Sequence, residues 1–196
     1  MIKLLDILRE NKILVPRRSP EERQKNYQII LQKKIQQYIK DGGKGNLNLR
    51  DTPIQSLPPG LKVRGDLYLR NTSIQSLPDN LEVGGHLDLR GTSIQSLPPD
   101  LEVGGDLDLE DTPIQSLPPD LKVRGTLFLN NTPIQLLPPG LEVGGDLDLR
   151  GTPIQSLPPG LKVRGDLDLR GTPISKKYTK EEVRKMVPGV EGNIFL

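Results

Sequence analysis

The sequence contains no cysteine, no tryptophan and a single histidine, and aromatic residues make up only 3% of its 196 residues. The absence of cysteine excludes disulfides, thiolate chemistry and cysteine-containing metal sites. No serine lies beside a plausible base, and the sequence has neither a P-loop nor a GxGxxG motif. Because these residues offer no catalytic constellation, we expect a protein that is not an enzyme and needs no cofactor.

Long apolar runs are also missing. No stretch approaches the roughly 18 consecutive apolar residues that a membrane-spanning helix requires. At the N-terminus, Lys3, Asp6 and Arg9 interrupt the apolar residues, so the hydrophobic region of a secretory signal is absent. We therefore expect a cytoplasmic protein without a membrane span, while a secreted or virion-associated location stays open.

The sequence is dominated by a repeat. Six copies of a 20-residue unit run without insertion or deletion over 45–164, and a partial seventh follows. In the copy at 65–84, polar and apolar residues alternate, which predicts a short strand with Leu67 and Leu69 pointing inward. An unbroken short period predicts a solenoid, because each coil buries its apolar edge only against a neighbouring coil.

The other apolar positions of each unit complete the predicted core. In the same copy, Ile74, Leu77, Leu81 and Val83 are expected to point inward. The segment 75–80 is too short for an α-helix, and the matching segments of most copies contain a Pro-Pro pair. The outer side of the solenoid is therefore predicted to be extended or polyproline-like.

The repeat resembles the bacterial 20-residue leucine-rich repeat, LxLxxNxLxxLPxxL, through the residues Leu67-x-Leu69-x-x-Thr72-x-Ile74-x-x-Leu77-Pro78-x-x-Leu81. The resemblance covers 45–174 and implies a leucine-rich-repeat solenoid with a parallel β-sheet on one face. Two features differ from that family: threonine replaces the usual asparagine in every copy, and the opening leucine is replaced by a valine one position earlier. The threonine hydroxyl can still satisfy buried backbone groups. The run L-x-V-x-G-x-L-x-L-x-x-T-x-I is also similar to uncharacterised repeat proteins of tailed bacteriophages, a likeness that implies no activity.

Residues 1–44 are predicted to form a helical N-terminal cap on the solenoid, which occupies 45–174. A first helix is expected over 1–16. A second begins with a capping box at Ser19 and Glu22 and ends at Gly42-Gly43. This segment carries 11 Lys and Arg against 5 Asp and Glu, so contact with nucleic acid or anionic lipid is an alternative to capping.

Residues 175–196 are predicted to form a C-terminal cap helix and a final strand. A capping box at Thr179 and Glu182 begins a short helix that runs through Val187. The last five residues repeat the G-x-L-x-L pattern of the repeats, which predicts an eighth strand. Its edge, with Ile194, Phe195 and Leu196, is a candidate surface for self-association.

The exposed side of the predicted strands, here called the strand face, carries three columns of equivalent residues, because parallel strands stack in register. The first column is Asn46, Asp66, His86, Asp106, Thr126, Asp146 and Asp166; the second is Asn48, Tyr68, Asp88, Asp108, Phe128, Asp148 and Asp168; the third is Arg50, Arg70, Arg90, Glu110, Asn130, Arg150 and Arg170. Clustered carboxylates such as Asp146 and Asp166 can bind Ca²⁺ or Mg²⁺. Because arginines neutralise the neighbouring column and no loop can wrap an ion, we expect no metal site.

Several residues break the repeat pattern, namely Tyr68, His86, Phe128 and Asn130 on the strand face and Leu136 on the outer side. Such breaks indicate either contact with a partner or drift in the array. We predict a non-catalytic module that binds a protein, favouring a basic one, and has no small-molecule substrate. The predicted binding residues are Tyr68, Arg70, His86, Asp88, Arg90, Asp108, Glu110, Phe128, Asn130 and Asp148. The alternatives are a self-assembling structural component and nucleic-acid binding through the basic N-terminal helix.

Overall fold

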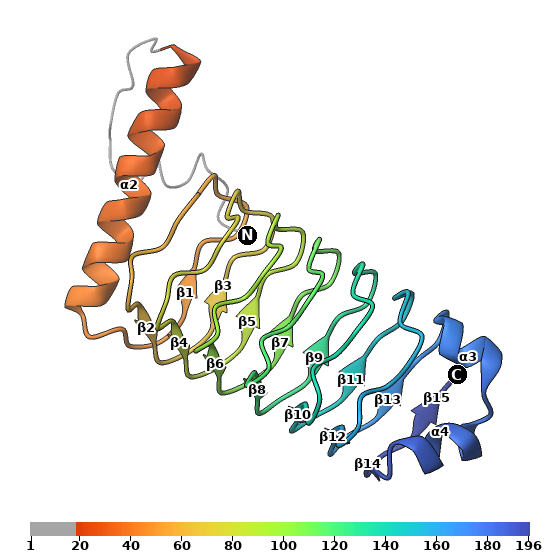
Figure 1. Cartoon of the computed structure of the whole chain (residues 1–196). Coiled ribbons are helices and arrows are strands. Elements are labelled where there is room, and N and C mark those ends of the chain that lie inside the picture. The colour runs from red at the N-terminus through yellow and green to blue at the C-terminus, as the bar shows by residue number, and fades with distance from the viewer. Residues whose placement is uncertain (1–18) are drawn as a thin grey trace. The chain divides into compact units, whose positions relative to one another are not determined.

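The computed structural model describes residues 19–196, and the chain divides into two compact units, Met1–Gln36 and Gln37–Leu196. The helix predicted over 1–16 lies outside the described residues. The domain boundaries after 44 and 174 stay predictions, as does the capping role of residues 1–44. Within the second unit, coils of parallel strands stack one upon the next, which confirms a solenoid with a 20-residue period (Figure 1).

The helix predicted after Ser19 is confirmed as α2 (Pro20–Lys40). Its capping box is formed, because the Ser19 N–H donates to Glu22 Oε2 at 2.9 Å and the Glu22 N–H donates to Ser19 Oγ at 3.2 Å. The helix ends at two glycines with positive φ, and the Gly43 N–H closes the last turn on the Tyr38 carbonyl at 3.0 Å. The Tyr38 hydroxyl lies 2.8 Å from the Gly43 carbonyl oxygen and 2.7 Å from that of Gly45, so it ties this turn to the start of the first coil.

Two parallel sheets line the solenoid. The eight-stranded sheet contains β1 (Leu47–Asn48), β3 (Leu67–Tyr68), β5 (Leu87–Asp88), β7 (Leu107–Asp108), β9 (Leu127–Phe128), β11 (Leu147–Asp148), β13 (Leu167–Asp168) and β15 (Ile194–Phe195). The seven-stranded sheet contains β2 (Lys62–Val63), β4 (Glu82–Val83), β6 (Glu102–Val103), β8 (Lys122–Val123), β10 (Glu142–Val143), β12 (Lys162–Val163) and β14 (Gly189–Val190). Neighbouring strands are one coil apart, and within the repeats each pair joins equivalent residues of successive copies, such as Leu67 and Leu87.

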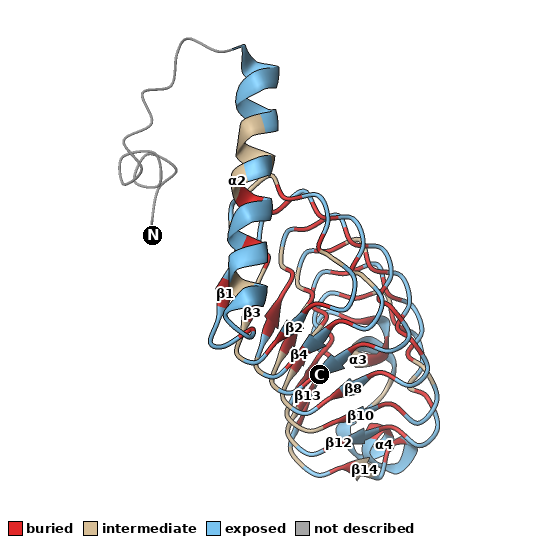
Figure 2. Ribbon diagram, turned by 90° about the vertical axis from the view of Figure 1, so that its left-hand side faces the viewer, coloured by how far each residue is buried: buried red, intermediate tan, exposed pale blue. Residues whose placement is uncertain are grey.

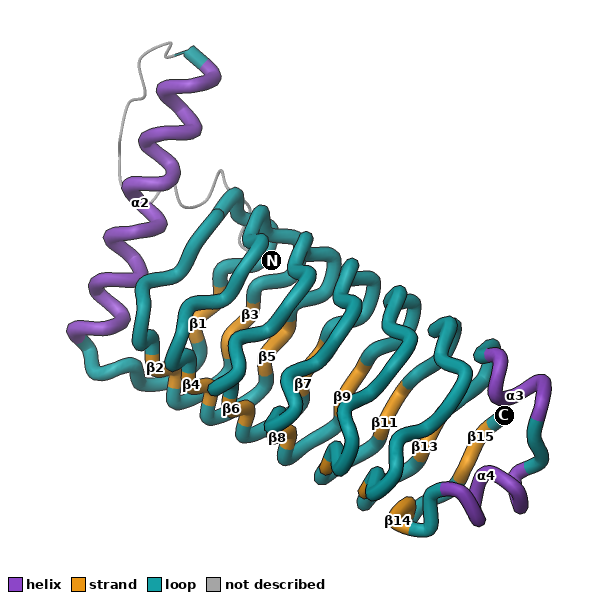
Figure 3. The backbone as a smooth tube through the Cα atoms, in the orientation of Figure 1, coloured by secondary structure: helices purple, strands orange, loops and turns teal. Residues whose placement is uncertain are grey.

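The second sheet was not predicted from the sequence. Within the repeats, its strands consist of a lysine or glutamate followed by a valine. Two residues are too few to show an alternation of polar and apolar positions. The outer segments between the two sheets have no regular secondary structure and appear as loops in Figure 3. Sheet pairing therefore occupies two faces of each coil rather than the single face that the repeat pattern implied.

Aliphatic residues form the core, and buried residues recur in every coil (Figure 2). In the coil at 65–84, Leu67, Leu69, Ile74 and Leu81 are all 0% exposed, as predicted. A threonine turns the chain after each strand of the eight-stranded sheet from β1 to β13. The Thr72 hydroxyl donates to the Leu69 carbonyl at 2.7 Å, and the same bond recurs in every coil. Threonine thus satisfies a buried backbone oxygen within its own coil.

The C-terminal end departs from the repeat through two short helices. The first, α3 (Pro173–Lys177), is capped by Thr172 and was missed by sequence reasoning. It forms because the Gln-Ser-Leu-Pro stretch of earlier coils is replaced by a stretch without proline. The second, α4 (Lys180–Met186), has the predicted capping box at Thr179. The eighth strand is also confirmed: β15 pairs with β13, with Ile194 buried and Phe195 beside Asp168.

Arg184 on α4 closes part of the end of the stack. Its guanidinium donates to the Val190 carbonyl oxygen at 2.5 Å and to the Gly192 carbonyl oxygen at 2.7 Å. The equivalent carbonyls one coil earlier, Val163 and Gly165, accept the backbone N–H groups of Glu191 and Gly192. Arg184 therefore supplies the two donors that a further coil would have provided, and α4 lies against β15.

The glycines that begin the second and later repeats, such as Gly125, lie where successive coils come very close. A Cβ on Gly125 would overlap Asp106 Oδ1 and would lie 2.7 Å from the carbonyl carbon of Gly105 in the preceding coil. Nothing lies within 4 Å of a Cβ added to Gly140, so only its positive φ of +70° disfavours other residues there. Packing between coils thus requires glycine at Gly125, whereas backbone conformation favours it at Gly140.

These two glycines should respond differently to substitution. We expect Gly125→Ala to lower the free energy of unfolding by about 3 kcal/mol, because the coils must separate to admit the methyl group. Gly140→Ala should cost about 1 kcal/mol, the strain of alanine in the left-handed region. Urea unfolding followed by circular dichroism measures both. Equal losses at the two positions would contradict the close stacking at Gly125.

Candidate functional site

The first column of the strand face forms a continuous hydrogen-bond ladder. Each side chain accepts the backbone N–H of the equivalent residue in the next coil, at 2.7–3.2 Å, from Asn46 to the N–H of Asn193. The aspartates, the histidine and the threonine have in common an acceptor atom close to the backbone. His86 and Thr126 therefore fulfil a structural role in the ladder, which was not recognised from the sequence.

His86 takes part in this ladder through its Nδ1 atom. This atom accepts the Asp106 N–H at 2.9 Å and lies 3.1 Å from Asp106 Oδ2. From the preceding coil, Asp66 Oδ1 accepts the His86 N–H at 2.9 Å, and this bond is the main cause that holds the pKa of Asp66 below its usual value.

The second and third columns form ion pairs within a coil. Asp88 pairs with Arg90, Asp148 with Arg150 and Asp168 with Arg170, and in each pair the arginine Nε lies 2.9 Å from the aspartate Oδ1. In the first two pairs the aspartate is buried, with 4% of Asp88 and 7% of Asp148 exposed. Burial alone would raise the pKa of Asp88, but hydrogen bonds from Arg90 and Arg50 outweigh it and lower the pKa. Arg90 and Arg50 thus favour the ionised form of Asp88 despite its burial.

Tyr68 is held by contacts on both sides. Its ring lies under the Arg50 guanidinium, whose Cζ is 3.8 Å from the ring centroid. Its hydroxyl donates to Asp66 Oδ2 at 2.7 Å, and this bond is the main cause that raises the pKa of Tyr68. Arg50 reaches past the coil of Tyr68 to pair with Asp88 Oδ2 at 2.9 Å. Tyr68 is therefore an ordered, half-buried part of the strand face.

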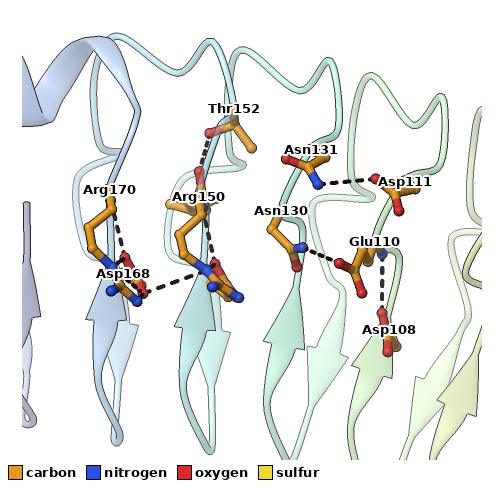
Figure 4. Close-up of polar contacts among 11 residues, drawn as sticks. Asp108, Glu110, Asp111, Asn130, Asn131, Arg150, Thr152, Asp168 and Arg170 are labelled. Carbon is orange, nitrogen blue, oxygen red and sulfur yellow. Dashed lines mark hydrogen bonds and ion pairs between the residues drawn. The ribbon is translucent and has the colours of Figure 1, made fainter.

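The regular pairing breaks in the coils at 105–124 and 125–144 (Figure 4). Glu110 occupies the third column where an arginine would pair with Asp108. Asp108 is instead reached by Arg90 of the preceding coil, with Nε 3.0 Å from Oδ2. In the next coil, Phe128 lies in register with Asp108, and the buried Asn130 donates to Glu110 Oε1 at 2.7 Å.

The predicted binding residues all lie on the strand face, but they differ in exposure. Arg70 and His86 are exposed, and within the described residues Arg70 makes no ion pair. Half-buried positions are Tyr68, Arg90, Asp108, Glu110 and Phe128; buried positions are Asp88, Asn130 and Asp148. Leu136, on the outer side, is 68% exposed. The structure brings the strand-face residues into one continuous surface; their role in binding stays a prediction.

Two further findings concern residues 19–196. In this range, no group of three or more histidine, aspartate and glutamate side chains is arranged to hold a metal ion. No helix of the same range is both long enough and apolar enough to cross a membrane.

Comparison with protein-family models finds none that matches this chain, and no curated protein matches it either.

The His86 contact predicts a local effect of substitution. His86→Asn keeps a side-chain acceptor close to the backbone, as at Asn46, whereas His86→Ala removes it. We therefore expect the Asp106 amide to lose protection from hydrogen exchange in His86→Ala and to keep it in His86→Asn. Equal protection in the two variants would contradict the contact with Nδ1.

The raised pKa of Asp108 predicts that the free energy of unfolding depends on pH. Its pKa is raised to about 6, first by burial and then by the charges of Asp88 and Glu110, against the opposing effect of Arg90 and the Glu110 N–H. A carboxyl group whose pKa is higher in the folded state favours folding when it is protonated. Its contribution to stability therefore falls as the pH rises from about 4 to about 6.

The test compares two aspartates of the same column. Relative to the unaltered protein, Asp108→Asn should gain on the order of 1–3 kcal/mol of unfolding free energy between pH 4 and pH 7. At Asp168, burial alone would raise the pKa, but hydrogen bonds from Arg170 outweigh it and the pKa is lowered. The stabilisation that ionised Asp168 provides is therefore lost only as the pH falls below about 4. Between about pH 4 and pH 7, the difference in unfolding free energy between Asp168→Asn and the unaltered protein should stay constant. Urea unfolding across this pH range measures both, and a flat profile for Asp108→Asn would contradict the raised pKa.

Proposed function

We propose that this protein is a non-catalytic repeat module that binds another protein through its strand face. The observation that carries the proposal is the fixed geometry of that face. Its carboxylates and guanidinium groups are held by hydrogen bonds within and between coils, so little side-chain freedom is lost when a partner binds. A rigid surface with ordered charges suits recognition of a partner of complementary charge.

We further propose that the module is a variant of the bacterial 20-residue leucine-rich repeat. The support is that the leucine and isoleucine positions shared with that repeat are buried, and that a polar residue turns the chain after each strand of the eight-stranded sheet. The second parallel sheet is a departure from the single sheet that the resemblance implies.

The contacts at the end of the stack argue against the self-assembling alternative. Ile194 of β15 is only 3% exposed, α4 lies against this strand, and Arg184 occupies two carbonyl oxygens that an added coil would use. Phe195 is 37% exposed, and the guanidinium of Arg170 and the ammonium of Lys180 lie 5.7 Å and 5.8 Å from its ring centroid. These cations lower the tendency of the edge to pair with a second chain.

Phe128 offers a direct test of the strand face. Proteins captured from the native host by the full chain provide the partner, and calorimetry then measures its affinity for variants. We expect Phe128→Ala to weaken binding by about 2 kcal/mol, roughly 30-fold, as truncation of an aromatic hot spot does. Lys122→Ala, an exposed change on the seven-stranded sheet, is the control and should have no effect. If the control weakens binding while Phe128→Ala does not, the strand face is the wrong surface.

A further inference from the structure

The strand face has one coil in which negative charge is left without its own cation. In the coils of Asp88, Asp148 and Asp168, the third-column arginine pairs with the aspartate beside it. In the coil at 105–124 all three columns are acidic, with Asp106, Asp108 and Glu110. The charge pattern of the repeat is therefore inverted at a single position, the third column of this coil.

The nearest cation compensates only in part. Arg90 of the preceding coil contacts Asp108 through Nε, but its guanidinium also pairs with Asp88, with Nη2 2.9 Å from Oδ2. Glu110 has no ion pair within the described residues, and its one hydrogen-bonded oxygen accepts from the neutral amide of Asn130. Arg90 and Arg150 interact electrostatically with Glu110 without forming an ion pair with it, so the coil of Asp108 and Glu110 keeps an excess of negative charge.

The next coil adds an apolar ring and no charge. Its three strand-face residues are Thr126, Phe128 and Asn130. The Phe128 backbone is in register with Asp108, so the aromatic side chain follows the carboxylate in the second column. Asn130, 6% exposed, fixes the position of the Glu110 carboxylate through its amide (Figure 4). We call Asp108, Glu110, Phe128 and Asn130 the β7–β9 patch.

We propose that the β7–β9 patch is the docking position for an arginine side chain presented by a basic segment of a partner protein. The inference rests on the proposed function and adds the place and the chemistry of recognition. Unlike the coils of Asp88, Asp148 and Asp168, the coil of Asp108 has no third-column arginine. Phe128 of the next coil is in register with its second-column carboxylate. A planar guanidinium can bond to carboxylates in a forked manner and stack on a ring, which an ammonium group does less well.

The protonation behaviour of Asp108 is consistent with an unfilled cation position. Its pKa is raised to about 6, while that of Asp168, which pairs with an arginine of its own coil, is lowered. Burial is the main cause of the raised pKa of Asp108, and a docked guanidinium would stabilise its ionised form and lower this pKa.

The test uses hexa-arginine and hexa-lysine peptides as probes of the full chain, with binding mapped by backbone amide shifts in NMR at low salt. We expect hexa-arginine to shift the amides of Asp108, Glu110 and Asn130, and to bind more tightly than hexa-lysine. Glu110→Gln should weaken hexa-arginine binding at least tenfold. Glu102→Gln removes the same charge from β6 in the seven-stranded sheet and should leave binding unchanged.

A second variant fills the position from within the chain. Glu110→Arg introduces the arginine that five of the seven third-column positions carry. It should pair with Asp108, lower the pKa of Asp108 and abolish the hexa-arginine shifts in a protein that stays folded. Retained binding in this variant would overturn the inference. So would shifts centred on Asp146 and Asp166, although these would leave the strand face as the binding surface. Shifts confined to the seven-stranded sheet would overturn the inference, and the native-partner measurement with Phe128→Ala then decides separately whether the proposed function stands.

Discussion

Stacking of identical coils in register is the physical constraint on which this protein depends. Each strand is only two residues long, so no strand could form by itself. The strands persist because backbone N–H groups of one coil donate to carbonyl oxygens of the next or preceding coil, and the aliphatic column behind them is continuous. A single insertion within one repeat would shift all the contacts that follow, which explains why the copies are equal in length.

The same constraint decides which polar residues the surface accepts. A side chain in the first column must accept a backbone N–H from the next coil, so asparagine, aspartate, histidine and threonine all serve. The residue after each third-column position has positive φ and is aspartate, asparagine or glycine; Asp51, Asn71 and Gly91 begin this series. What looks like sequence variation on the strand face is thus partly a set of equivalent solutions to one geometric requirement.

The proposed docking position lies where the charges of the repeat are not paired within their own coil. Most strand-face charges are neutralised by a neighbour, and they give the surface rigidity more than net attraction. The coil of Asp108 and Glu110 keeps a negative excess, and the following coil places an aromatic residue beside it. A partner gains most where the module has left a charge without a counter-charge, because compensated pairs elsewhere offer little additional energy.

The sequence alone determined the solenoid, its period, the inward positions of Leu67 and Leu69, the capping boxes at Ser19 and Thr179 and the eighth strand at the C-terminus. These features are encoded locally, by spacing and by short motifs that a 20-residue window contains. The second sheet, the first-column ladder and the roles of Arg184 and Arg50 were decided only by the tertiary structure. Each depends on contacts between coils, as when Arg50 reaches Asp88 across 38 residues, and no local pattern records which side chains such stacking will bring together.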